Sequence, residues 1–293
     1  MLKTILTTCL LLLPLSIVFP MTTKVEPPLF YWDARPRLGF SNFGDAMSVS
    51  IVERILGKPI ATTTHATPGK KKFLAIGSIV NYADEGDVLW GTGVNGSYPK
   101  HSDYHFTSLD VRAVRGPLSR QFLMEMGINC PEVYGDPTLL LPQLFPEFQK
   151  PSSPSQEYVV IPHFSDEALF KHLPNMVSVK EDWQVVVRKI LDSQFVISSA
   201  LSGVIVAEAF GIPARLIVAP NENNTETLFK YADYYQGTHR FNFRFATSIE
   251  EALEMGGEPL PECDLERLLQ AFPYDLFELT EQSTGQNKLQ FFL

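Results

Sequence analysis

Two turns in this sequence combine backbone N–H groups, hydroxyls and an arginine in a way that suits the binding of an anion. The first turn lies in Gln194–Pro213, QFVISSALSGVIVAEAFGIP. Its apolar run at 195–197 predicts a strand, the small residues 198–200 predict a tight turn, and the pattern from Ser202–Gly203 to Gly211 predicts a helix. The first N–H groups of a helix lack partners within it, and the helix dipole favours negative charge there. The turn therefore predicts an anion site, although an ordinary strand–helix–strand connection has the same pattern.

The second turn lies in Val111–Arg120, VRAVRGPLSR. Arg115 ends a predicted strand, Gly116 makes the turn, and Pro117 suits the first position of a helix. Arg115 thereby places a full charge and a planar fork of N–H donors beside a second helix N-terminus, which predicts binding of a carboxylate or phosphate. A structural ion pair is the alternative. Arg112, on the same face of the strand, is a second candidate, with burial against acidic groups as its alternative.

Three further groups of candidates follow predicted strands. Asp136 closes the predicted strand 133–136 and is either a ligand-positioning acid or a helix cap. His163 follows the strand 158–161, where it would face a cleft and exchange a proton near neutral pH; a structural histidine is the alternative. Gly91 and Gly93 belong to GTGVNG, a weak match to the dinucleotide-binding pattern because no apolar helix follows it. These glycines instead predict a loop that approaches a ligand closely.

The elements that must position these residues alternate between strand and helix in two blocks. Such alternation predicts mostly parallel sheets with helices on both faces. The polar, proline-rich segment 150–156 predicts a linker. We therefore expect an α/β protein of two Rossmann-like lobes, 27–149 and 157–280, with a cleft between their strand ends. In the first lobe, Asp45 is expected to cap the helix 46–56.

Composition narrows the classes of function. The chain has 293 residues, of which 45% are hydrophobic, enough for a sizeable core. A net charge of −9 with one short basic cluster at 70–72 argues against nucleic-acid binding. No motif for nucleoside triphosphate hydrolysis or for an esterase nucleophile is present. The cysteines Cys9, Cys130 and Cys263 lack metal-ligand spacing, so we expect free thiols, with one disulfide as an alternative, and no bound metal.

Residues 1–20 differ from the rest of the chain. Lys3 precedes an apolar run at 5–19 that is shorter than a bilayer-spanning helix and suits a signal peptide. Because no small-x-small cleavage site follows, an uncleaved N-terminal anchor and a start at Met21 are alternatives. The segment thus predicts membrane association or export, and a cytoplasmic protein if translation starts at Met21.

The order and spacing of several motifs resemble the polysaccharide pyruvyl transferase family from about residue 42 to 240. These motifs are NFGD at 42–45, IGS at 76–78, LWGTG at 89–93, VRGP at 114–117, YGDP at 134–137, PH at 162–163, SSALSG at 198–203 and KYADYY at 230–235. The resemblance implies a fold like the glycosyltransferase B fold. It also implies transfer of pyruvate from phosphoenolpyruvate onto two sugar hydroxyls, which makes a cyclic ketal.

The resemblance assigns roles to particular residues. Arg115 would bind phosphoenolpyruvate, and the turn Leu201-Ser202-Gly203 would surround the bound molecule. The matched motifs further make substrate-binding candidates of Asn42, Asp45, Gly91, Gly93 and Ser199.

One position departs from the family. Ser202 stands where the family has a histidine, and a serine can bind phosphate but cannot act as an acid at neutral pH. Either another group such as His163 then supplies the proton, or the protein is slow or inactive. Asp136 and Ser202 are the further candidates for the catalytic site. The expected partners are phosphoenolpyruvate and a glycan, without a cofactor. A catalytically degenerate glycan-binding relative and a nucleotide-sugar glycosyltransferase are the alternative functions.

Overall fold

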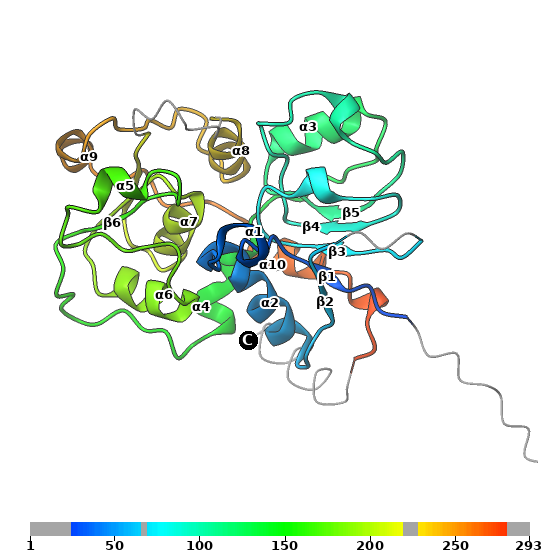
Figure 1. Ribbon diagram of the computed structural model, residues 1–293, viewed down its shortest axis with the longest axis horizontal. Coiled ribbons are helices and arrows are strands. Elements are labelled where there is room, and N and C mark those ends of the chain that lie inside the picture. Colours follow the sequence, from blue (N-terminus) through cyan, green and yellow to red (C-terminus); the bar gives the residue numbers. More distant parts are fainter. Residues whose placement is uncertain (1–24, 66–68, 219–227, 280–293) are drawn as a thin grey trace, which may run out of the picture.

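Strands and helices alternate through two α/β lobes, each built on a parallel sheet (Figure 1). The computed structural model describes residues 25–65, 69–218 and 228–279. The predicted signal peptide or anchor at 1–20 lies outside the described residues, and so does Cys9. The mixed α/β class with parallel sheets is therefore confirmed.

The N-terminal lobe contains a five-stranded parallel sheet in the order β2-β1-β3-β4-β5. Its strands are β1 Leu29–Phe30, β2 Thr62–Thr63, β3 Phe73–Leu74, β4 Val88–Trp90 and β5 Asp110–Ala113. The central strands β1, β3 and β4 are buried and apolar throughout. Parallel strands consist of consecutive apolar residues when both faces of the sheet are covered.

Alternate side chains of these strands point to two different helices. Phe73 and Trp90 face the core formed with α2, whereas Leu74 and Leu89 face the core formed with α3. This alternation is the period of two expected of a strand. The helical elements of the lobe are α1 Arg35–Leu38, α2 Phe43–Leu56, η1 Val80–Tyr82, η2 His101–Asp103, α3 Pro117–Glu125, η3 Pro137–Leu140 and α4 Leu141–Leu144.

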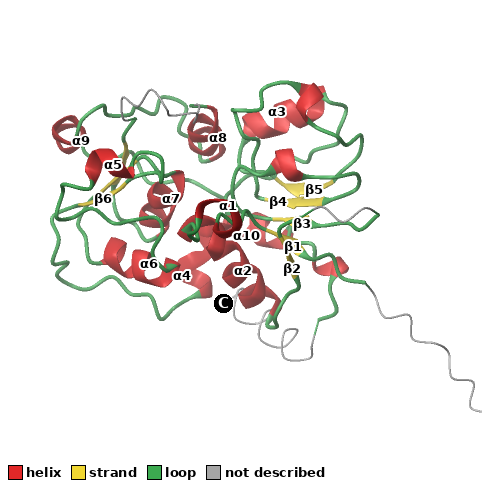
Figure 2. Cartoon of the chain, in the orientation of Figure 1, coloured by secondary structure: helices red, strands yellow, loops and turns green. Residues whose placement is uncertain are grey.

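The C-terminal lobe repeats the arrangement around a three-stranded parallel sheet in the order β6-β7-β8. The strands are β6 Val159–Ile161, β7 Val196–Ser198 and β8 Ala214–Leu216. Helices surround this small sheet (Figure 2). They are α5 Glu167–Phe170, α6 Trp183–Leu191, α7 Leu201–Ala209, α8 Phe229–Gly237 and α9 Ile249–Met255. The predicted strand–turn–helix at 195–211 is therefore present as β7 and α7.

Two local predictions were wrong. Helix α2 begins three residues earlier than expected because Asn42, and not Asp45, is its N-cap: the Asn42 Oδ1 atom accepts a hydrogen bond from the Gly44 N–H at 3.0 Å. Asp45 lies inside the first turn, where a negative charge suits the helix dipole. The expected strand 133–136 is reduced to one isolated bridge between Val114 and Tyr134.

The last described helices return to the first lobe. Helix α10, Leu265–Gln270, receives a hydrogen bond on its Leu268 carbonyl from the indole N–H of Trp90, at 2.8 Å. Phe272 then packs edge-on against Trp90 with ring centroids 4.9 Å apart, and η4, Tyr274–Leu276, follows. The predicted range of the second lobe, 157–280, thus includes a segment that packs on the first lobe.

The two lobes also share one continuous hydrophobic cluster. Residues of α2, η3 and α4 pack with residues of α6 and α7 in this cluster. A second cluster fills the far face of the N-terminal sheet, and a third fills the outer face of the C-terminal sheet. The segment 150–156 therefore connects the two lobes along the chain, but the hydrophobic core is continuous between them.

Three absences concern the described part of the chain only. No helix there is long and apolar enough to cross a bilayer. No group of three or more His, Cys, Asp or Glu side chains within it is placed to hold a metal ion. Cys130 and Cys263 are free thiols, and burial raises the pKa of each to about 12.

Candidate active site between the lobes

A cavity of about 220 Å³ lies between the two lobes. Its walls come from segments that follow β3 and β5 on one side and β6 and β7 on the other. Open α/β sheets form their binding sites at this edge, because the chain leaves the strands there in loops. The lining residues used below are Trp32, Asn42, Gly44, Ser78, Tyr82, Tyr98, Arg115, Asp136, His163, Phe164, Leu201, Ser202 and Lys230.

Arg115 lies at the buried end of this cavity with only 1% of its surface exposed. Its Nε donates to Asp233 at 3.0 Å, one Nη to the Ser78 hydroxyl at 2.5 Å, and the other Nη to the Val94 carbonyl at 3.1 Å. A guanidinium carries five N–H groups. Two of them therefore remain without a partner among the described residues, on a side chain that borders the cavity. An anion in the cavity can accept from them.

The packing that holds Arg115 depends on close backbone approach. Asp233 of α8 also accepts from the backbone N–H and the hydroxyl of Ser119, at 2.8 and 2.6 Å, which fixes the carboxylate against α3. Gly116 lets α8 come near, since a Cβ there would lie 1.8 Å from the Asp233 carbonyl oxygen. Gly93 lies against the guanidinium, where a Cβ would stand 2.3 Å from the Arg115 Cζ atom.

The N-terminus of α7 forms the opposite wall. Ala200 is the N-cap and offers no side-chain hydroxyl to the first N–H groups of the helix. Leu201 and Ser202 border the cavity, and a Cβ on Gly44 would lie only 2.5 Å from the Ser202 hydroxyl oxygen. The first turn of α7 therefore meets the N-terminal lobe, and Ser202 shares one cavity with Arg115. Helix dipole and arginine both favour an anion between them.

His163 follows β6 and borders the same cavity. Its Nδ1 atom lies 2.7 Å from the Ser165 hydroxyl oxygen, and its backbone N–H donates to the Ser199 hydroxyl at 2.9 Å. Its ring packs against Phe164 with centroids 4.2 Å apart. The histidine is thus held in place from its backbone, its ring face and one ring nitrogen.

Asp136 is a buried carboxyl group that borders the cavity. It caps η3 by accepting from the Thr138 N–H at 2.9 Å. Burial raises the pKa of Asp136, while the hydrogen bonds from Thr138 and the charge of Arg115 oppose that rise. Asp136 thus caps η3 and also borders the cavity. The predicted role as a helix cap is therefore compatible with the alternative role as a ligand-positioning acid.

Comparison with known proteins agrees with this geometry. Residues 42–219, more than half of the chain, match the family model of polysaccharide pyruvyl transferase. The chain belongs to the polysaccharide pyruvyl transferase family. The match spans the six predicted site residues that the cavity brings together, which are Asn42, Arg115, Asp136, His163, Leu201 and Ser202.

Two individual proteins are similar to this member of the polysaccharide pyruvyl transferase family. An uncharacterized protein of Acanthamoeba polyphaga mimivirus is 25% identical over 228 residues, which cover 73% of this chain and 78% of the viral one. A crystal structure of an uncharacterized protein from Klebsiella pneumoniae is 11% identical with a TM-score of 0.43, covering 75% of this chain and 93% of that one.

Six of the predicted site residues of this pyruvyl transferase family member do not border the cavity. Arg112 pairs with Asp110 and Asp275 on the surface instead. Ser199 donates to the Asp166 carboxylate and accepts from the His163 N–H, so it supports the wall from behind. The other four lie outside the cavity lining and pack against neighbouring segments: Asp45, Gly91, Gly93 and Gly203.

The predicted glycines allow close packing of neighbouring segments. Gly91 has a positive φ of 82°, and a Cβ there would lie 2.4 Å from Pro137. Gly203 faces the Ser198 hydroxyl, where a Cβ would lie 2.5 Å away. Gly93 lies against Arg115, and Asn95 of the same loop borders the cavity, so the approach of the loop at 91–96 to a ligand stays a prediction.

Several residues that border the cavity were not predicted. Lys230 is the first residue of the KYADYY motif at 230–235, and the sequence assigned it no role. Its side chain is buried and borders the cavity. Tyr82 and Tyr98, with 40% and 42% of their surface exposed, and the half-buried Trp32 and Phe164 complete the wall. Large aromatic side chains in turns were the available signal for these four residues.

Proposed function

We propose that this protein transfers pyruvate from phosphoenolpyruvate onto two hydroxyls of a sugar in a polysaccharide. A proton adds to the methylene carbon of the enol, and a sugar hydroxyl attacks the central carbon and loses its proton. The second hydroxyl then attacks the same carbon while phosphate leaves and takes up a proton. The products are a cyclic ketal and inorganic phosphate, and no cofactor besides the donor is needed.

The observation that supports the donor site is the buried Arg115 with two unused N–H groups at the cavity. Phosphoenolpyruvate carries a carboxylate and a phosphate, so it needs positive charge on more than one side. Lys230 and the first turn of α7 add to Arg115 from the C-terminal lobe. Fixed donors in a closed site bind such a dianion and stabilise the charge that develops on the departing phosphate.

His163 is the proton donor that this proposal favours. An imidazole exchanges a proton near neutral pH, as the addition to the enol carbon requires. Asp136, whose pKa burial raises, is the second acid at the cavity. Ser202 is left with the role of a hydrogen-bond partner for phosphate.

The acceptor sugar is placed at the aromatic side of the cavity. Tyr82, Tyr98, Trp32 and Phe164 present ring surface there, while Arg115, Asp136 and Lys230 are buried. The exposed Arg37 also borders the cavity. Exposed aromatic side chains that border a pocket commonly provide contact area for a partly apolar ligand. A pyranose ring has apolar C–H faces and outward hydroxyls, which suits these rings on one side and the donor on the other.

A phosphate-release assay tests the proposal. The full chain is incubated with phosphoenolpyruvate and a panel of polysaccharides, and inorganic phosphate and the ketal are measured. We expect release only with donor and acceptor together. Arg115→Lys should abolish most of it, whereas the control Arg112→Lys, a substitution on the same strand segment but outside the cavity, should not change it. Equal losses in both variants would contradict the placement of the donor.

A non-catalytic glycan-binding role is the second candidate, and Ser202 at the position of the family histidine favours it. In that case the chain binds a polysaccharide with the same affinity in the presence and absence of phosphoenolpyruvate, and releases no phosphate. Ser202→His would then be the variant that creates measurable release. Thermal stabilisation by a nucleoside diphosphate but not by phosphoenolpyruvate would contradict both candidates.

A further inference from the structure

A buried carboxylate lies behind His163 and is connected to it by two serines. Asp166, 1% exposed, accepts from the Ser199 hydroxyl at 2.8 Å and from the Ser165 hydroxyl at 3.1 Å. Ser165 is also the residue whose hydroxyl oxygen lies 2.7 Å from the His163 Nδ1 atom. Ser199 in turn accepts from the His163 backbone N–H. The two serines thus connect one carboxylate to both the ring and the backbone of the histidine.

The surroundings fix this arrangement. The backbone N–H of Asp166 donates to the His163 carbonyl at 2.8 Å, which closes a tight turn from 163 to 166. Tyr231 of α8 donates its hydroxyl proton to the Ser199 carbonyl at 2.6 Å. Such a network in a buried place is held in one geometry, because each donor and acceptor that lost its partner would be costly.

Counting protons connects this geometry to the chemistry of the ring. A serine hydroxyl has one proton to donate. The buried Asp166 carboxylate has the stronger need for a donor, so the Ser165 proton points to it. The Ser165 oxygen can then only accept, and the group that can donate to it across 2.7 Å is an N–H at His163 Nδ1. The longer contact from the Ser165 backbone N–H to Nδ1, at 3.4 Å, is too weak to compete.

We propose that Asp166, acting through Ser165, holds neutral His163 in the tautomer with hydrogen on Nδ1. The Nε2 atom is then the one that takes up the proton and gives it away. Asp166 and Ser165 are positioning residues for His163, with Ser199 fixing the backbone beneath it. The catalytic meaning of this arrangement rests on the proposed function, whereas the tautomer itself does not.

Nitrogen-15 NMR of the full chain labelled at histidine tests the tautomer directly. The sequence has six histidines, and His163→Gln identifies the signals of His163 by their loss. At a pH where the ring is neutral, the wild type should show a protonated Nδ1 and an unprotonated Nε2. In Ser165→Ala and Asp166→Asn, the Nε2-protonated form should become the major one. A wild-type ring protonated at Nε2, or variants that keep the wild-type tautomer, would overturn the proposal.

A matched control is available elsewhere in the lobe. Asp192 accepts from the Ser155 backbone and hydroxyl on the surface, away from the cavity. Asp192→Asn removes a comparable serine-bound carboxylate and should leave the His163 signals unchanged. A change in this control as large as in Asp166→Asn would show a general effect of charge, and would also overturn the proposal.

Steady-state kinetics provide the catalytic readout. A misplaced ring proton should lower kcat by about 10- to 100-fold in Asp166→Asn and Ser165→Ala, and leave the KM for phosphoenolpyruvate unchanged. A raised KM with unchanged kcat would show that the residues serve donor binding, against the proposal. If the NMR result is as expected but the wild type transfers no pyruvate, the positioning role of Asp166 stands and the proposed function fails.

Discussion

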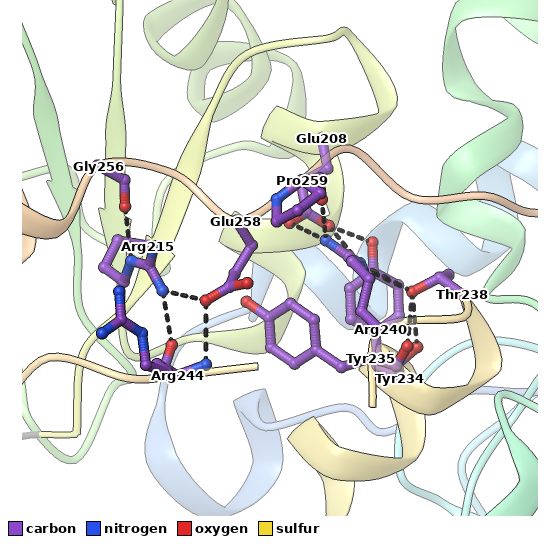
Figure 3. Close-up of polar contacts among 10 residues, drawn as sticks. All are labelled: Glu208, Arg215, Tyr234, Tyr235, Thr238, Arg240, Arg244, Gly256, Glu258 and Pro259. Carbon is purple, nitrogen blue, oxygen red and sulfur yellow. Dashed lines mark hydrogen bonds and ion pairs between the residues drawn. The ribbon is translucent and has the colours of Figure 1, made fainter. Parts of the chain in front are cut away.

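Three buried arginines among the described residues pair with acidic side chains, and two of them, Arg240 and Arg115, differ in how many of their N–H groups are used. Arg240 donates from all three of its nitrogens (Figure 3): to both oxygens of Glu208 at 2.6 and 2.9 Å, to the Thr238 hydroxyl at 3.0 and 2.9 Å, and to the Pro259 carbonyl at 2.8 Å. These five bonds use every N–H group that a guanidinium has. Arg115 uses three.

The difference separates a structural arginine from one that is ready to bind. Arg240 lies over the rings of Tyr234 and Tyr235, and Tyr234 adds a hydrogen bond to Glu208 at 2.6 Å. This site ties the segment after α8 to α7 and has no donor left for a ligand. Arg115 is also buried but borders the cavity with two N–H groups remaining. Both arginines are buried and both form an ion pair, so these two properties alone do not distinguish them.

The largest expected effect concerns the structural arginine. Arg240→Met leaves the Glu208 carboxylate buried without its cation, so the free energy of unfolding should fall by about 3–5 kcal/mol. Urea unfolding measures it. The exposed Arg244→Met is the control and should change stability by less than about 0.5 kcal/mol. A loss in Arg240→Met no larger than in the control would remove the distinction between the two buried arginines.

The next effect concerns Arg115, the arginine that we propose binds the donor. Arg115→Lys keeps a positive charge but loses the planar fork, and we expect kcat/KM for phosphoenolpyruvate to fall about 100-fold, equivalent to about 2.7 kcal/mol. Isothermal titration with phosphoenolpyruvate should show the same loss in affinity. Unchanged binding in this variant would make Arg115 a purely structural residue like Arg240.

A smaller effect concerns the buried acid beside Arg115. Because burial raises the pKa of Asp136, the folded protein holds this proton more tightly than the unfolded chain does. The stabilising contribution of that proton is complete below the unfolded pKa and is lost as the pH rises through the folded pKa. Asp136→Asn, which keeps the cap, should therefore raise Tm by about 3 °C at pH 7, with the gain vanishing near pH 3 to 4.

Thermal unfolding monitored by circular dichroism across pH 3 to 8 measures this gain. A Tm lower than that of the wild type at pH 7 would show that the charge of Arg115 dominates the environment of Asp136. In that case Asp136 would resemble Glu208, a partner in an ion pair, more than an acid poised at a cavity.

The smallest effect concerns Ser202. Ser202→Ala removes one hydroxyl from the first turn of α7, so we expect phosphoenolpyruvate affinity to fall about threefold to tenfold with kcat unchanged, the cost of one hydrogen bond. Kinetics with varied donor concentration separate the two parameters. A large fall in kcat would instead place Ser202 in the proton transfer.

The fold could be predicted from the sequence where the pattern is local. The strand at 88–90 and the turn before α7 follow from apolar runs that end at small residues, and the structure has them at those positions. The start of α2 was missed because Asn42 and Asp45 are both good cap residues, and only the backbone conformation at Asn42 decides between them.

The site could be predicted only in part, because its partners are distant in sequence. Arg115 was found from its place after a strand, but its partner Asp233 lies 118 positions away. Arg112 lies three positions earlier, within β5, and is paired on the surface with Asp275, 163 positions away. Tertiary packing therefore decides which of the two arginines keeps unpaired N–H groups. A sequence motif contains no information about that packing.

The core that runs through both lobes limits how the cavity can change shape. Swinging the lobes apart as rigid bodies would expose the apolar contacts among α2, α6, α7 and η3, at about 25 cal/mol for each Å². The cavity is consequently pre-organised, so an anionic ligand would pay little conformational cost on arrival. We therefore expect a ligand to enter by local movement of exposed side chains such as Tyr82 and Tyr98, and not by a hinge between the lobes.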